Sequence, residues 1–187
     1  WNDILFRGTF NQEYNVSLSG GSEKATYYTS LGYYDEKGNV KGVEADRLNM
    51  VLKTSYKVNK MLKVGASLFA NRRTNKSNLT DSDGFSNPVY YSRRANPYQT
   101  PFDEDGNYVY DIDIQGKGDS DLKFNVFEEP NNTSYEQTTN ALSAIFDVEL
   151  RFNDKFKATS QVGLQLDAVS KESIADHDTY AMRKDKE

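Results

Sequence analysis

The feature that most constrains this chain is a strict alternation of apolar and polar residues, sustained over unusually long stretches. Between residues 137 and 152, apolar residues take every second position from Leu142 through Phe146 to Phe152, with mostly polar residues between them. A two-residue period indicates a β-strand with one apolar face. Strands of soluble domains typically contain ~5 to 6 residues, whereas a tilted strand that crosses a bilayer needs ~9 to 11. The length of the alternation therefore favours membrane-crossing strands.

The same period recurs along the chain and predicts strands at approximately residues 10–19, 24–34, 45–58, 62–73, 137–152 and 156–169. We therefore expect an all-β fold, an antiparallel up-and-down meander of long strands that forms a single segment of a large transmembrane β-barrel, with one long loop inserted at 74–135. In this fold the faces with Leu48, Met50 and Leu52 and with Phe146, Val148 and Leu150 touch lipid, and the Lys and Glu faces look inward.

The predicted connections alternate in length. They are short at 20–23, 59–61 and 153–155, and long at 35–44, at 74–135 and from 170 onward. Outer-membrane barrels have short periplasmic turns and long extracellular loops, so this alternation gives the strands a membrane polarity. A soluble β-sandwich or a lipocalin-like ligand-binding module remains the alternative, because burial against a second sheet produces the same apolar face.

Composition narrows the function classes. The chain has no Cys, which removes thiolate metal sites and cysteine nucleophiles, and its net charge of -5 argues against a nucleic-acid partner. No Gly-x-Ser-x-Gly or phosphate-binding Gly-x-x-x-x-Gly-Lys motif occurs. We expect neither an enzyme nor a cofactor. With 36% hydrophobic residues, the sequence also contains no apolar run of the ~20 residues that a transmembrane helix requires.

The segment 74–135 carries the candidate contact residues, because a loop of this length is usually functional. Aromatic rings and planar cations suit ligands such as sugars, which stack on aromatic faces. The candidates for contact with a ligand or a partner are Tyr90, Tyr91, Arg93, Arg94, Tyr98, Phe102, Tyr108 and Tyr110. The alternative, which we favour, is that these side chains pack the loop against itself or against a partner protein.

Weaker signals in the loops favour solvent-exposed turns. Asp81–Gly84 and Asp103–Gly106 are faintly similar to calcium loops but lack the terminal bidentate Glu. His177 has no second His or Cys to complete a metal site, so no metal is expected. The run from Tyr108 to Ile114 predicts a small hairpin inside the long loop.

Several blocks in order resemble the SusC/RagA family of TonB-dependent outer-membrane transporters. They are Trp-Asn-Asp-Ile-Leu-Phe-Arg at 1–7, Gln-Glu-Tyr-Asn-Val-Ser-Leu-Ser-Gly-Gly at 12–21, Tyr-Tyr-Thr-Ser-Leu-Gly-Tyr at 27–33, Arg-Leu-Asn at 47–49 and Lys-Met-Leu-Lys-Val at 60–64. The resemblance implies a large barrel with an N-terminal plug in the bacterial outer membrane. It also implies energy from TonB, a SusD-like surface lipoprotein as lid, and an oligosaccharide or peptide substrate. About six strands are fewer than the eight of the smallest membrane barrels, so we expect this chain to be an excised piece of the barrel wall.

Overall fold

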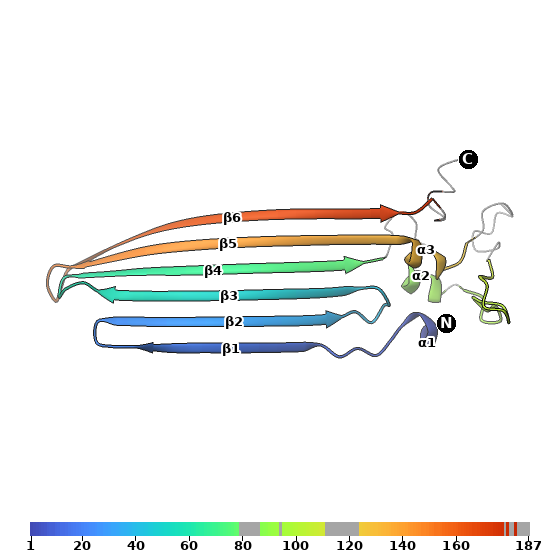
Figure 1. The fold of residues 1–187 in the computed structure, drawn as a ribbon, viewed down its shortest axis with the longest axis horizontal. Helices are drawn as coiled ribbons and strands as arrows, with labels where there is room; N and C mark the ends of the chain where they lie inside the picture. Colours follow the sequence, from blue (N-terminus) through green and yellow to red (C-terminus); the bar gives the residue numbers. More distant parts are fainter. Residues whose placement is uncertain (79–86, 94, 111–123, 178, 180–181, 183–187) are drawn as a thin grey trace.

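The computed structural model describes residues 1–78, 87–93, 95–110, 124–177, 179 and 182. They form a six-stranded antiparallel sheet in which the strands follow one another in chain order (Figure 1). The strands are β1 (Gln12–Gly21), β2 (Ala25–Lys37), β3 (Glu44–Lys57), β4 (Leu62–Ser77), β5 (Thr133–Arg151) and β6 (Lys157–Ala175). Short helices α1 (Asn2–Leu5), α2 (Pro88–Ser92) and α3 (Glu128–Asn132) lie beside one end of the sheet. The predicted all-β antiparallel meander of long strands is confirmed.

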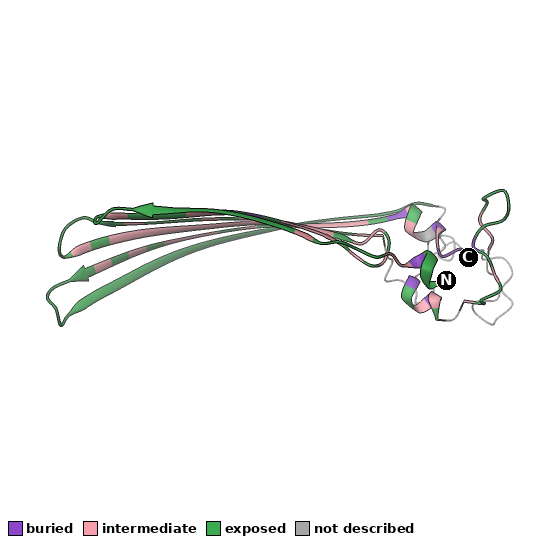
Figure 2. Cartoon of the chain, turned by 90° about the horizontal axis from the view of Figure 1, so that it is seen from below, coloured by how far each residue is buried: buried purple, intermediate pink, exposed green. Residues whose placement is uncertain are grey.

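The sheet is a single curved and twisted layer (Figure 2). Each strand pairs with its neighbour in sequence, and within the described residues β1 and β6 do not pair with each other. Both edge strands therefore leave backbone groups open along one side. None of the described helices has the length and apolarity needed to cross a membrane.

The long loop is shorter than the alternation predicts. β4 continues to Ser77 and β5 begins at Thr133, so the connection covers residues 78–132 instead of 74–135. The pairing of Thr74 with Thr138 and of Lys76 with Glu136 is regular, although neither face is apolar there. Because both faces of these strand ends are polar, the period of two disappears from the sequence while the backbone ladder continues. β6 extends past residue 169 to Ala175 in the same way.

The short turns share one device. The side-chain oxygens of Ser22, Asn59 and Asn153 each accept hydrogen bonds from the backbone N–H groups two and three residues further on, at 2.8 to 3.3 Å. Asn and Ser favour such turns because their side chains replace a backbone acceptor at a point where the chain reverses. These local bonds fix where each hairpin turns.

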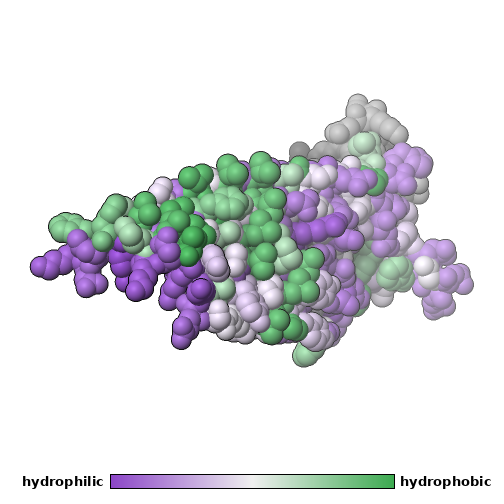
Figure 3. Space-filling model, turned by 60° about the vertical axis from the view of Figure 1, so that its left-hand side comes forward, coloured by the Kyte–Doolittle hydropathy of each residue, from purple (hydrophilic) through white to green (hydrophobic). Residues whose placement is uncertain are grey.

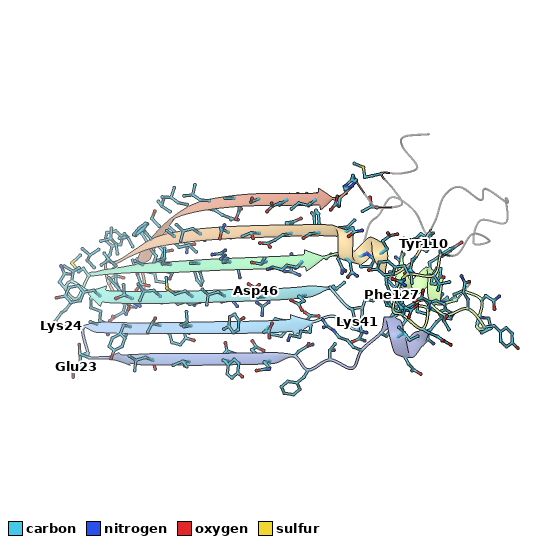
Figure 4. All side chains as sticks on the ribbon, turned by 45° about the vertical axis from the view of Figure 1, so that its right-hand side comes forward. Glu23, Lys24, Lys41, Asp46, Tyr110 and Phe127 are labelled. Carbon is cyan, nitrogen blue, oxygen red and sulfur yellow. The ribbon has the colours of Figure 1, made fainter. Side chains whose placement is uncertain are left out.

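The short connections lie at one end of the sheet and the longer connections lie at the other. The turns after β1, β3 and β5 lie at one end, and the N-terminus and the described parts of the longer connections after β2 and β4 lie at the other (Figure 1). Side chains mark the two ends clearly: Glu23 and Lys24 lie at the short turns, and Lys41, Tyr110 and Phe127 lie at the loop end (Figure 4). The predicted alternation of short turns and long loops is present in the structure.

The buried core belongs to the loops and not to the sheet. Leu5, Tyr91, Phe124 and Val126 are all at most 4% exposed and form one cluster, to which Trp1 packs from the side. This cluster lies beyond the strand ends, where burial is concentrated in Figure 2. The hydrophobic residues of the strands contribute nothing to it. The described residues therefore contain a small hydrophobic core at the loop end, and the sheet has no buried core of its own.

Candidate functional site

An apolar band runs across one face of the sheet. Strand pairing aligns one apolar row across all the strands, formed by Val16, Leu31, Met50, Ala70, Leu142 and Leu166. Parallel rows extend the band along the strands. Its other large members are Tyr14, Leu18, Tyr27, Tyr33, Leu48, Leu52, Leu62, Val64, Leu68, Phe146, Val148, Leu150, Val162 and Leu164. Figure 3 shows hydrophobic side chains gathered over the strands, with hydrophilic ones dominating the loop end.

A polar row closes the band on the loop side. It runs across the sheet through Gln12, Asp35, Asp46, Thr74, Thr138 and Ser170. Between this row and the short turns, β5 presents apolar residues from Leu142 to Phe152, which matches the ~9 to 11 residues of a tilted membrane-crossing strand. The band therefore has the height of a bilayer core and a defined upper border.

No described residue covers the band. Leu164 is 63% exposed and Phe146 53%, and the described residues contain no second sheet that packs against either. Contiguous exposed apolar patches of this size mark interaction surfaces. A sandwich or lipocalin-like module buries its apolar face against a second layer or a closed barrel interior, so the described residues do not support that alternative.

The opposite face carries paired polar and aromatic side chains. The Arg47 guanidinium lies 5.4 Å from the ring centre of Tyr34, and the Lys53 ammonium lies 5.3 Å from that of Phe69. Both distances suit cation–π attraction. Near the short turns Glu149 accepts a hydrogen bond from Arg151 at 3.2 Å, and its carboxylate lies 3.9 Å from the Lys157 ammonium. These positions lie on the polar face of the sheet.

The predicted contact residues of the loop fall into different environments. Tyr91 lies in the loop core, 2% exposed, with its ring 5.1 Å from that of Trp1 in an edge-on arrangement. Tyr98 is the opposite extreme at 94% exposed. Tyr90 is half-buried on α2 and Arg93 is exposed at its end, while Arg94 lies outside the described residues.

The remaining candidates pack within the loop. Phe102 stacks on Tyr108, with ring centres 5.6 Å apart, and the hydroxyl of Tyr110 donates to the Glu128 carboxylate at 3.2 Å. Tyr108 also accepts a hydrogen bond from the Asn131 amide at 2.9 Å. Phe102 and Tyr108 form an antiparallel bridge, which is the described part of the predicted hairpin; Ile112 and Ile114 lie outside the described residues.

A residue that the sequence did not single out holds this loop together. Asn125 is 3% exposed, and its amide donates to the carbonyls of Pro101 and Val109 at 2.8 and 2.9 Å. Its side-chain oxygen accepts from the Phe127 N–H at 2.8 Å. A buried Asn in a loop has no periodic signal, so only its apolar neighbours Phe124 and Val126 mark the position in the sequence.

The turn at Asp103 uses its carboxylate internally. One oxygen accepts from the N–H groups of Asp105 and Asn107, and the other accepts from the Asn107 amide at 3.1 Å. The bonds from Asn107 hold the pKa of the Asp103 carboxyl below its usual value. Gly106 completes the turn with a φ of 84°, a backbone conformation that favours glycine. This arrangement agrees with a plain acidic turn.

Metal binding finds no support in the part of the chain that the structure describes, where no group of acidic or His side chains is arranged to hold an ion. His177 contacts the Asp176 carboxylate, and this bond lowers the pKa of Asp176. The other calcium-like segment, Asp81–Gly84, lies outside the described residues.

We compared the sequence and the fold with those of known proteins. No family model matches the chain. The TonB-dependent receptor P39 of Formosa agariphila is 32% identical over 95 residues, which cover 51% of this chain and 9% of the relative. The chain is similar to a TonB-dependent receptor over half of its length. A second one, receptor P26 of the same organism, is 31% identical over 112 residues, covering 58% of this chain and 10% of the receptor.

One solved structure is similar to nearly the whole fold of this chain. The RagAB peptide importer in its closed-closed state superposes with a TM-score of 0.76 over 96% of this chain and 20% of the importer chain, at 19% identity. The chain spans about a tenth of the length of the curated receptors that it matches. The fold match to a fifth of an importer chain agrees with the predicted segment of a larger barrel.

Proposed function

We propose that this chain is part of the barrel wall of a TonB-dependent nutrient importer in the bacterial outer membrane. The observation that carries the proposal is the uncovered apolar band, which has the height of a bilayer core. Its short turns then lie in the periplasm and its long loops outside the cell. The polar face with Arg47, Lys53 and Glu149 lines the lumen.

The partners follow from the position of the loops. We infer that a SusD-like surface lipoprotein sits over the loop end and that TonB acts through a region of the parent protein outside this chain. The substrate class is oligosaccharide or peptide fragments. Support comes from the names of its curated relatives and from the fold shared with a peptide importer.

Within the loop, Tyr98 and Arg93 are the contact residues that we assign to the substrate or the lid. Both are exposed, whereas Tyr91 is committed to the loop core. Replacing Tyr98 by Ala in the parent importer is expected to reduce uptake or lid binding without changing the thermal stability of the barrel. Tyr108→Phe, which removes only the hydroxyl that accepts from Asn131, serves as the matched control. Equal uptake in wild type and Tyr98→Ala would remove Tyr98 from the contact surface.

The orientation of the wall is tested by spin labels on neighbouring positions of β5. We expect a label at Leu150 in the parent protein, reconstituted in vesicles, to be accessible to oxygen in the lipid phase. A label at Glu149 is expected to be accessible to a water-soluble relaxation agent. The reverse pattern would refute the proposed barrel wall.

A further inference from the structure

The polar face of the sheet carries a stripe of positive charge along β3 and β4. Over the described length of these two strands, the side chains that alternate to this face include several cations and no carboxylate. We call these cations the cation stripe: Arg47, Lys53 and Lys57 on β3, and Lys63 and Arg73 on β4. Because a strand rises ~3.3 Å per residue, Arg47 and Lys57 lie about 33 Å apart along β3. The stripe therefore runs from the loop side of the sheet to its short turns.

At each end of the stripe two cations face each other directly. Arg47 pairs with Arg73 towards the loops, and Lys57 pairs with Lys63 beside the turn at 59–61. Like charges at directly opposed positions of an antiparallel pair destabilise the sheet. An anion bound between two such cations reverses this cost, because it attracts both of them. Two opposed pairs on one face of the same two strands therefore indicate an anionic ligand.

The partners of the stripe within the sheet leave its charge in place. Arg47 and Lys53 lie against the rings of Tyr34 and Phe69, and the Arg73 guanidinium donates to the Asn75 side-chain oxygen at 3.1 Å. These partners are neutral. No carboxylate oxygen of the described residues lies within 4.0 Å of a nitrogen of the stripe.

Carboxylates border the stripe on both sides. On the polar face they are Glu13 on β1, Glu36 on β2, Asp147 and Glu149 on β5, and Asp167 on β6. Glu149 lies between Arg151 and Lys157, and Asp167 accepts a hydrogen bond from the Gln165 amide at 2.8 Å. Asp147 comes nearest to the stripe, because it lies over Gly65 of β4. These carboxylates confine an acidic ligand to β3 and β4 by repelling it from either side.

The turn end of the stripe is hollowed. A polar hollow of about 450 Å³ is lined by the cations Lys57, Lys60, Lys63 and Arg151, and Glu149 is the carboxylate among its described lining residues. The volume is within the ~300 to 1,000 Å³ of small-molecule sites. A concave surface lined mainly by one sign of charge concentrates ions of the opposite sign. The hollow therefore suits an acidic group that reaches the short turns.

We propose that the cation stripe binds acidic substrates during import, namely oligosaccharides or peptides whose repeated carboxylates pair with its cations. The inference rests on the proposed barrel wall, in which the polar face lines the lumen. At the loop end, the planar forks of Arg47 and Arg73 match the geometry of a carboxylate. Lys53 lies between the two opposed pairs, so an extended acidic chain meets a cation at each stage. A neutral substrate gains nothing from these pairs.

The stripe is tested by measuring ligand binding to the purified parent importer in detergent. The acidic probes are oligogalacturonate and oligoglutamate, and their neutral counterparts are methyl-esterified oligogalacturonate and oligoglutamine. We expect at least one acidic probe to bind more tightly than its counterpart, and the probe that does so identifies a saccharide or a peptide as the source of the carboxylates. Arg73→Gln is expected to weaken that binding about fivefold. Arg72→Gln is the matched control, because it removes the same charge from the preceding residue, on the opposite face.

Thermal unfolding of the same variants separates binding from a structural role. Arg73→Gln removes the repulsion between Arg73 and Arg47, so the unfolding temperature of the parent protein is expected to stay equal or to rise while acidic binding weakens. A lower unfolding temperature with unchanged binding of the acidic probes would mean that the pair serves only the fold.

Two further outcomes would overturn the stripe. One is equal affinity of the wild type for acidic and neutral probes. The other is a cross-link from Arg73→Cys to another segment of the parent protein that persists in saturating acidic probe, because the parent's own chain then covers the stripe. A spin label at Ser67, on the polar face of β4, separates the two proposals. If that label is exposed to lipid, the barrel-wall orientation fails; if it is exposed to water while acidic and neutral probes bind alike, only the stripe fails.

Discussion

Single polar residues in the loop cluster control its order, and Asn125 is the clearest case. Asn125→Ala leaves the carbonyls of Pro101 and Val109 without their buried donor, at an expected cost of about 1 to 3 kcal/mol to the local fold. We expect faster cleavage of the loop by an added protease, with the heat-induced unfolding of the barrel unchanged. Asn131→Ala, which removes a single exposed hydrogen bond, is the control. Equal cleavage rates for both variants would contradict this role.

The Asp103 turn gives the loop a pH dependence at the scale of one carboxyl group. Its pKa is lower in the folded turn than in the unfolded chain, so the folded state binds the proton less well. The stabilisation is therefore complete above about pH 4 and is lost as pH falls through the lower folded pKa. Amide exchange at Asn107 is expected to accelerate in that acidic range. Asp103→Asn should abolish the acid-induced step, and an unchanged step in that variant would exclude Asp103 as its source.

At the scale of single elements, each short hairpin turn is held by one side-chain oxygen that accepts two backbone hydrogen bonds. Asn153→Ala removes the oxygen that holds two backbone N–H groups, and about 1 kcal/mol of stability is expected to be lost. Asn153→Ser should retain most of that stability, because Ser22 already makes the same turn between β1 and β2. Urea titration of the refolded parent barrel measures the difference. Identical midpoints for the Ala and Ser variants would argue against the shared turn device.

The two faces of one strand should respond in opposite ways to charge. Leu68 faces the apolar band near its middle, and Ser67 faces the polar side. Leu68→Arg is expected to destabilise the barrel in vesicles by about 2 to 4 kcal/mol, the cost of Arg on a lipid face near the midplane. Ser67→Arg should cost far less, because that face is already polar. Similar losses for the two variants would contradict a lipid-facing band.

At the scale of the whole molecule, the described residues form a sheet with two open edges and an uncovered apolar face. Expressed alone without detergent, the chain is expected to associate through β1, β6 and the apolar band, because exposed edges and apolar patches promote aggregation. Size-exclusion chromatography and light scattering at increasing concentration measure this association. A monomer that unfolds cooperatively in plain buffer would contradict the barrel-wall proposal.

The strands could be predicted from the sequence because the alternation of apolar and polar residues is visible in the sequence without any tertiary contact. The six strands and the lengths of their connections follow from residues such as Leu142 to Phe152 and from turns such as Asn153. The strand ends at residues 74–77 and 133–136 escaped prediction, because polar residues on both faces carry no period. The opposed pair of Arg47 and Arg73 could have been noticed, because the short turn at 59–61 fixes the register of the two strands. Asn125 could not, because its role depends on contacts between distant parts of the loop.

Among the described residues, the buried hydrophobic cluster lies at one end of the sheet, and this placement affects how the sequence can diverge. A packed interior accepts side chains by shape, whereas a fluid hydrocarbon environment accepts them by polarity alone. Along the apolar band, Leu, Val, Met and Phe are therefore interchangeable over time as long as the alternation persists. Architecture can then outlast sequence, which agrees with a TM-score of 0.76 to the importer at only 19% identity. By the same reasoning, substitutions should accumulate more slowly around Tyr91 and Phe124 than along the strands.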